Sequence, residues 1–149
     1  MTKKSPEDVF RDILDTIEKQ FTVEPVRDEA DFESQLFQFL KATYGAGRIE
    51  RQVPFRVGRL DILIDNKYVL ELKLADSPAN LRSLTGQLIE YKQEYPNVAA
   101  VILDTGSVGT QDIDYYTQLY EKQGASVIVL RGNRRGKRGR GGININIPR

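Results

Sequence analysis

The sequence contains no cysteine and no histidine among its 149 residues. Their absence excludes Ser-His-Asp and Cys-His catalytic triads, zinc sites built from thiolates or imidazoles, haem ligation by either residue, and a disulfide framework. Chemistry in this chain is therefore left to carboxylates, lysine, hydroxyls and amides, or to a hard metal ion held by oxygen atoms.

Long apolar runs are also absent from the sequence. No stretch approaches the roughly 20 apolar residues that span a bilayer, and the N-terminal sequence MTKKSPEDVF lacks the apolar core of a signal peptide. We therefore expect a soluble, cytoplasmic protein without a membrane partner. The length fits one domain, because a chain of about 150 residues buries roughly 70% of its unfolded surface.

The net charge of +1 conceals an uneven distribution of charge along the chain. Residues 1–130 carry 15 Lys and Arg against 21 Asp and Glu, whereas residues 131–149 carry 7 Lys and Arg and no acid. We therefore expect an acidic domain over 1–130 and a basic Arg/Gly-rich tail over 131–149. Such a tail is typical of arms that contact phosphates, and its candidate nucleic-acid-binding residues are Arg134, Arg135, Lys137, Arg138 and Arg140.

The spacing of apolar residues predicts helices over about 6–20, 29–44, 79–95 and 112–123. It predicts strands over about 48–57, 60–64, 68–75, 98–104 and 125–131, with Gly58-Arg59 as the turn between the first two. The resulting order is α-α-β-β-β-α-β-α-β. A meander followed by crossover helices indicates an α/β protein with a mixed sheet and helices on both faces.

Two charges interrupt an otherwise apolar strand. Glu71 and Lys73 lie two residues apart in the segment YVLELKLA, so both side chains point to the same face of the sheet. Fully buried charges cost several kcal/mol each unless they are paired or bound to a metal. The pair is therefore either a polar site or a partly exposed ion pair at a strand end.

The expected register brings a third charge to this pair. If Asp65-Asn66-Lys67 forms a three-residue loop, Asp61 lies directly beside Glu71 on the face that carries Lys73. A two-residue loop would instead pair Asp61 with Leu72 and separate the carboxylates. Facing carboxylates repel each other, and a bound divalent cation converts that repulsion into coordination.

The same counting, continued through a Gly58-Arg59 turn, places Arg56 next to Asp61. Arg56 and Arg59 are candidate contacts for DNA phosphates near the site. Each is equally compatible with an ordinary solvated strand residue.

Three short motifs resemble the PD-(D/E)xK nuclease superfamily, which includes restriction endonucleases, Holliday-junction resolvases and RecB-type nucleases. The motifs are Gly58-Arg59-Leu60-Asp61, then Glu71-Leu72-Lys73, then Gln87 and Tyr91 in the arrangement QxxxY. The resemblance covers residues 32–104 and implies a restriction-endonuclease-like αβββαβ core. The chain departs from the family pattern in having Leu60, where proline usually precedes the aspartate.

This resemblance implies a set of site residues. Asp61, Glu71 and the carbonyl of Leu72 would hold Mg²⁺, with Mn²⁺ as a substitute. Lys73 would orient or deprotonate the attacking water.

Helical residues would complete the set. The Gln87 amide would hold a metal-bound water, and Tyr91 would share its helix face and contact nucleic acid; the alternative is an ordinary polar-aromatic helix pair. Glu33 is a further candidate acid from the helix before the meander, and the alternative is a solvated glutamate.

The sequence thus predicts a magnesium-dependent deoxyribonuclease that hydrolyses DNA phosphodiester bonds. Its substrate would be a particular DNA structure, such as a junction or flap, or its role would lie in restriction or repair. A homodimer follows if the protein cuts both strands, because one active site makes one cut. The alternative is a non-catalytic protein that binds DNA or RNA and retains the nuclease fold.

Overall fold

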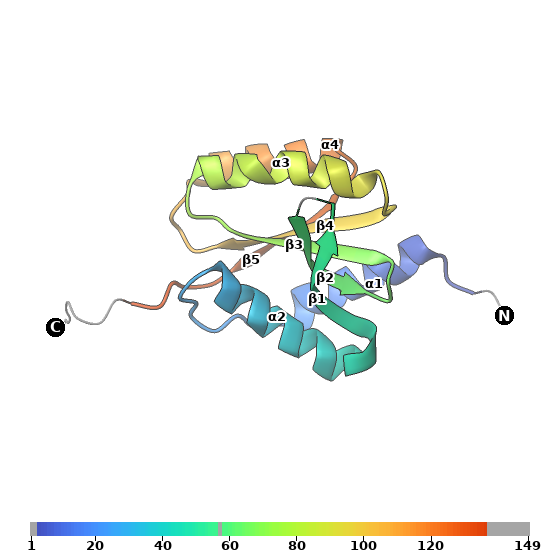
Figure 1. Cartoon of the computed structure of the whole chain (residues 1–149). Coiled ribbons are helices and arrows are strands. Elements are labelled where there is room, and N and C mark those ends of the chain that lie inside the picture. Colours follow the sequence, from blue (N-terminus) through green and yellow to red (C-terminus); the bar gives the residue numbers. More distant parts are fainter. Residues whose placement is uncertain (1–2, 57, 137–149) are drawn as a thin grey trace.

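The computed structural model describes residues 3–56 and 58–136 (Figure 1). It shows an α/β protein in which a five-stranded mixed sheet lies between two layers of helices. The α/β class and the order of helices and strands expected from the sequence are therefore confirmed.

The helical layers begin where the sequence supplies capping residues. Helix α1 (Pro6–Gln20) begins after Ser5, whose hydroxyl accepts a hydrogen bond from the Asp8 N–H at 3.1 Å. Helix α2 (Glu29–Tyr44) begins after Asp28 and ends at Gly45, whose φ of 102° suits glycine. The Asp28 cap fixes the N-terminal end of α2, which reaches the candidate site.

The remaining elements follow in the expected sequence, with one additional short turn. A 3₁₀ turn, η1 (Ala46–Arg48), leads into the meander β1 (Ile49–Phe55), β2 (Gly58–Ile64) and β3 (Tyr68–Leu74). Then come α3 (Pro78–Lys92), β4 (Asn97–Asp104), α4 (Thr110–Lys122) and β5 (Ser126–Arg131).

The strands lie side by side in chain order, β1 to β5. The β1–β2 and β2–β3 pairs are antiparallel, and the β3–β4 and β4–β5 pairs are parallel. Helices α1 and α2 cover one face and α3 and α4 cover the other (Figure 1). Leu70, Leu72 and Leu74 of β3 belong to the core under α1 and α2, so the alternate residues Glu71 and Lys73 share the face toward α3 and α4.

The register of β2 against β3 confirms the three-residue loop. Ile64 pairs with Tyr68, and the ladder continues through Leu63 to its last pair, Ile62 with Leu70. This is the register that brings Asp61 to the position beside Glu71.

The turn between β1 and β2 differs from the expectation. Phe55 pairs with Gly58, so the turn lies between these two residues and not at Gly58-Arg59, and Arg56 adopts a left-handed φ of 48°. The observed register of β1 against β2 differs from the expected one by an even number of residues. A shift of this kind keeps every side chain on the same face of the sheet, so the apolar pattern fits both registers. The expected placement of Arg56 beside Asp61 is therefore wrong, because Gln52 occupies that position.

The first residues of the basic tail lie against the fold. Arg134 forms a parallel bridge with Val26, the Val26 N–H donates to the Asn133 carbonyl, and the Arg135 N–H donates to the Val26 carbonyl. Lys137, Arg138 and Arg140 lie outside the described residues. Within the described ranges, no helix is both long and apolar enough to cross a membrane.

Candidate active site

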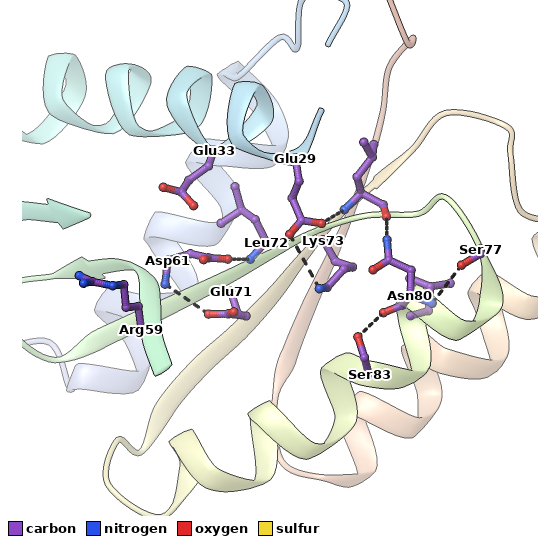
Figure 2. A network of polar contacts seen from close by, with 12 residues as sticks. Glu29, Glu33, Arg59, Asp61, Glu71, Leu72, Lys73, Ser77, Asn80 and Ser83 are labelled. Carbon is purple, nitrogen blue, oxygen red and sulfur yellow. Dashed lines mark hydrogen bonds and ion pairs between the residues drawn. The ribbon is translucent and has the colours of Figure 1, made fainter. Parts of the chain in front are cut away.

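The candidate site lies where the β2–β3 ladder stops. Beyond the last pair, side-chain carboxylates take over the backbone hydrogen bonds (Figure 2). The Leu72 N–H donates to Asp61 Oδ2 at 2.9 Å, and the Asp61 N–H donates to Glu71 Oε1 at 3.3 Å. The two carboxylates are thereby held at the same open end of the strand pair, as the register predicts.

Burial makes this carboxylate pair electrostatically unusual. Removal from water raises the pKa of Glu71 from 4.5 to about 9, and the neighbouring Asp61 charge contributes to this rise. Burial also raises the pKa of Asp61 from 3.8 to about 6, against the hydrogen bond from Leu72 that lowers it. Without a counter-ion, the pair therefore retains a proton near neutral pH.

Lys73 is the nearest positive charge on the same strand. Its side chain is only 12% exposed, and its Nζ lies 3.8 Å from Glu29 Oε2. The other oxygen of Glu29 accepts a hydrogen bond from the Leu74 N–H at 3.0 Å. The first residue of α2 therefore binds the end of β3 and holds the Lys73 ammonium group (Figure 2).

Glu33 is brought to the same region, one helical turn after Glu29. It is buried, and it accepts hydrogen bonds from Arg51 Nε at 2.5 Å and from Gln52 Nε2 at 2.8 Å. Its negative charge contributes to the raised pKa of Asp61. Glu33 is thus not a solvated surface glutamate.

The two predicted residues of α3 differ in their surroundings. The buried Tyr91 hydroxyl donates to the Arg59 carbonyl at 3.2 Å, and its pKa is raised by burial and then by the charge of Glu71. Gln87 is half-buried, and its Oε1 is buried without a hydrogen-bond partner among the described residues. Tyr91 therefore lies near the Asp61–Glu71 pair. The Gln87 side-chain oxygen could still accept a hydrogen bond.

The predicted phosphate-binding arginines occupy different positions. Arg56 forms an exposed ion pair with Glu94 at 2.7 Å. Arg59 is exposed on β2, and its Nη1 donates to the Gln52 carbonyl at 3.1 Å. Arg134 pairs with Asp76 at 2.7 Å. Arg59 and Arg134 are thus linked to segments that adjoin the site.

The donor set at the open end suits a hard cation. Because the N–H and C=O of one strand residue point to the same side, the Leu72 carbonyl faces the gap that Asp61 enters. Among residues 3–56 and 58–136, no three acidic side chains lie close enough to form a metal site by themselves. Mg²⁺ requires no such cage, because it usually binds through one or two carboxylates, water and substrate phosphate.

Sequence reasoning missed three residues at this site. Glu29 lies four residues before Glu33, and this helical spacing on one face was a usable signal. Gln52 was missed because the predicted β1–β2 turn placed Arg56 opposite Asp61 instead. Asn80, whose side chain donates to the Leu74 carbonyl, follows the helix cap Ser77 and carried no distinguishing pattern.

The chain was also compared with known protein families and with curated proteins. No family model matches the chain, and no curated protein matches it. The site itself consists of a proton-retaining carboxylate pair, a lysine on the same strand and a glutamate from α2.

Proposed function

We propose that this protein is a magnesium-dependent deoxyribonuclease that hydrolyses DNA phosphodiester bonds, with the PD-(D/E)xK arrangement that its motifs resemble. The observation that carries the proposal is the open end of the β2–β3 pair. There the Asp61 carboxylate accepts a hydrogen bond from the Leu72 N–H, and the Glu71 carboxylate accepts one from the Asp61 N–H. Lys73 follows Glu71 on the same strand. A buried like-charge pair is costly for folding alone, which favours a role with a bound cation.

Each residue has a distinct task in this proposal. Asp61, Glu71 and the Leu72 carbonyl would hold Mg²⁺, which would neutralise charge on the scissile phosphate and lower the pKa of a bound water. Lys73 would orient or deprotonate the attacking water. Glu29 supports that task, because its carboxylate holds the ammonium group from the α2 side.

The tail would add affinity for the DNA backbone. Arg134 pairs with Asp76, which lies three residues after Lys73, and also donates to the Arg27 carbonyl at 3.2 Å. The chain therefore enters its most basic stretch from a point close to the candidate catalytic strand. Phosphate contacts made there would supply salt-sensitive binding independent of sequence.

The proposal is tested by incubating the full chain with labelled linear, flapped and four-way DNA in Mg²⁺, Mn²⁺ or EDTA. We expect cleavage with either metal and none with EDTA. A parallel assay on supercoiled plasmid separates nicking from double-strand cutting, which would require two active sites. Absence of cleavage with both metals on every substrate would refute the nuclease assignment.

The test also includes the main alternative, a protein that binds nucleic acid without cutting it. Tight binding of DNA or labelled RNA without cleavage would establish that alternative. Cleavage of RNA in preference to DNA would correct the substrate class and leave the roles of Asp61, Glu71 and Lys73 in place.

A further inference from the structure

Gln52 has an exceptional backbone conformation for a residue inside a strand. Its φ is 53°, although Arg51 and Val53 on either side pair regularly with Ile62 and Leu60 of β2. Residues other than glycine rarely adopt this left-handed region, and such strain persists where the surrounding structure imposes it, often at functional sites. Gln52 is also the residue opposite Asp61.

The Gln52 side chain joins two carboxylates from different elements. Its Nε2 donates to Glu33 Oε1 of α2 at 2.8 Å and lies 3.3 Å from Asp61 Oδ1 of β2. A primary amide has two N–H donors, so one neutral group satisfies both acceptors. A carboxylate in its place would repel both, and an ammonium group would compete with a bound cation.

The Gln52 backbone extends the connection toward α3. Its carbonyl accepts from Arg59 Nη1 at 3.1 Å, and the Arg59 carbonyl in turn accepts from the Tyr91 hydroxyl. One strained residue thus links α2, β2 and α3 around Asp61.

We propose that Gln52 is a positioning residue for the carboxylate site. Its left-handed backbone places the amide between Glu33 and Asp61, and the amide sets the orientation in which Asp61 meets the metal and the phosphate. The inference rests on the proposed nuclease function and extends it to a residue outside the three resembling motifs.

Two substitutions separate the amide from the backbone. Gln52→Met keeps an unbranched side chain of similar length and removes the donors, whereas Gln52→Gly removes the amide and accommodates the left-handed backbone without strain. Gln35→Met is the matched control, because the Gln35 amide also makes two hydrogen bonds, both to the backbone of Glu24 and away from Asp61.

The measurements are kcat, KM for DNA, the Mg²⁺ concentration that gives half-maximal cleavage, and thermal unfolding of each full-length variant. We expect both Gln52 variants to lose about 10- to 100-fold in kcat, as is usual for residues that orient metal ligands. We also expect a higher Mg²⁺ requirement and an unchanged KM. Gln35→Met should match wild type in kcat, in KM and in its Mg²⁺ requirement.

The inference is overturned if wild type cleaves DNA and either folded Gln52 variant retains the wild-type kcat and Mg²⁺ requirement. If one variant melts below the assay temperature, the other decides. If wild type itself cleaves nothing, the proposed function fails and the positioning role fails with it, so the two failures are distinguishable.

Discussion

The two ends of the β2–β3 pair carry the same chemical group in opposite electrostatic states. At the closed end, Asp65 is held by Arg48 through two hydrogen bonds of 2.7 Å, which lower the pKa of the carboxyl. At the open end, Asp61 lies beside Glu71, and burial raises the pKa of both carboxyls. The first aspartate is ionised and partnered, while the second shares its surroundings with another acid.

Asp65 therefore has a structural role, whereas the Asp61–Glu71 pair is suited to binding a cation. Arg48 already neutralises Asp65, so a cation would gain little there. The Asp61–Glu71 pair lacks a comparable partner among the described residues, since Lys73 is held by Glu29. The open end is therefore where an added divalent cation relieves the most repulsion.

The largest expected difference between the two ends is in catalysis. Asp61→Asn or Glu71→Gln should lower Mg²⁺-dependent DNA cleavage by more than about 100-fold, because even residues that only orient metal ligands contribute about 10- to 100-fold. Asp65→Asn is the matched control and should cleave at the wild-type rate. Single-turnover rates on labelled DNA measure the difference, and equal rates for all three variants would remove the distinction between the ends.

The next effect concerns the contribution of the basic tail to DNA affinity. Deleting residues 136–149 removes Lys137, Arg138, Arg140 and Arg149 and leaves the docked Arg134 in place. The slope of log affinity against log salt on duplex DNA should become shallower by about 0.9 for each phosphate that these residues neutralise in the full chain. Fluorescence anisotropy in EDTA measures it, and an unchanged slope would show that these residues do not bind phosphates.

A smaller effect is expected in stability, where substitutions at the two ends should act in opposite directions. In EDTA at pH 8, Glu71→Gln should raise the free energy of unfolding by at least about 1 kcal/mol, because one unit of pKa shift corresponds to about 1.4 kcal/mol. This corresponds to about 3 °C in Tm for a chain of this length. Asp65→Asn should lower the stability by less than about 1 kcal/mol, as surface ion pairs do. Thermal unfolding gives both values, and a decrease in both variants would contradict the comparison.

The same raised pKa should also appear in the pH dependence of stability without metal. The raised pKa of Glu71 means that the folded state binds more protons than the unfolded state between pH 4.5 and about 9. Stability contributed by this group is therefore complete below pH 4.5 and is lost as the pH rises toward 9. Glu71→Gln should flatten this decline in urea unfolding measured from about pH 5 to about pH 9. Asp65 acts in the opposite direction, since its lowered pKa means that its contribution is lost only in acid.

Sequence patterns predicted the elements and the β2–β3 register well, for identifiable reasons. Ser5 and Asp28 are strong helix caps, and the apolar period changes clearly at Ile49. The charged Glu71 and Lys73 inside an apolar strand marked the site, because burying charge without purpose is costly.

The rest depended on information that apolar periodicity does not carry. The position predicted for the β1–β2 turn was wrong, because a register shift of even length leaves every side chain on the same face of the sheet. That displacement hid Gln52, whose left-handed backbone has no signature in a residue other than glycine or asparagine. The contacts of Glu29 with Lys73 and Leu74 join distant segments of the chain, which local spacing cannot specify.

Metal binding at the open end can be measured by Mn²⁺ titration calorimetry on the full chain at pH 7, in two buffers of different ionisation enthalpy. We expect one bound ion per chain with net proton release, since a metal displaces the proton that the Asp61–Glu71 pair retains. Binding should persist in Asp65→Asn and disappear in Asp61→Asn and Glu71→Gln. Absence of binding by wild type, or equal binding by all variants, would contradict a metal site at the open end.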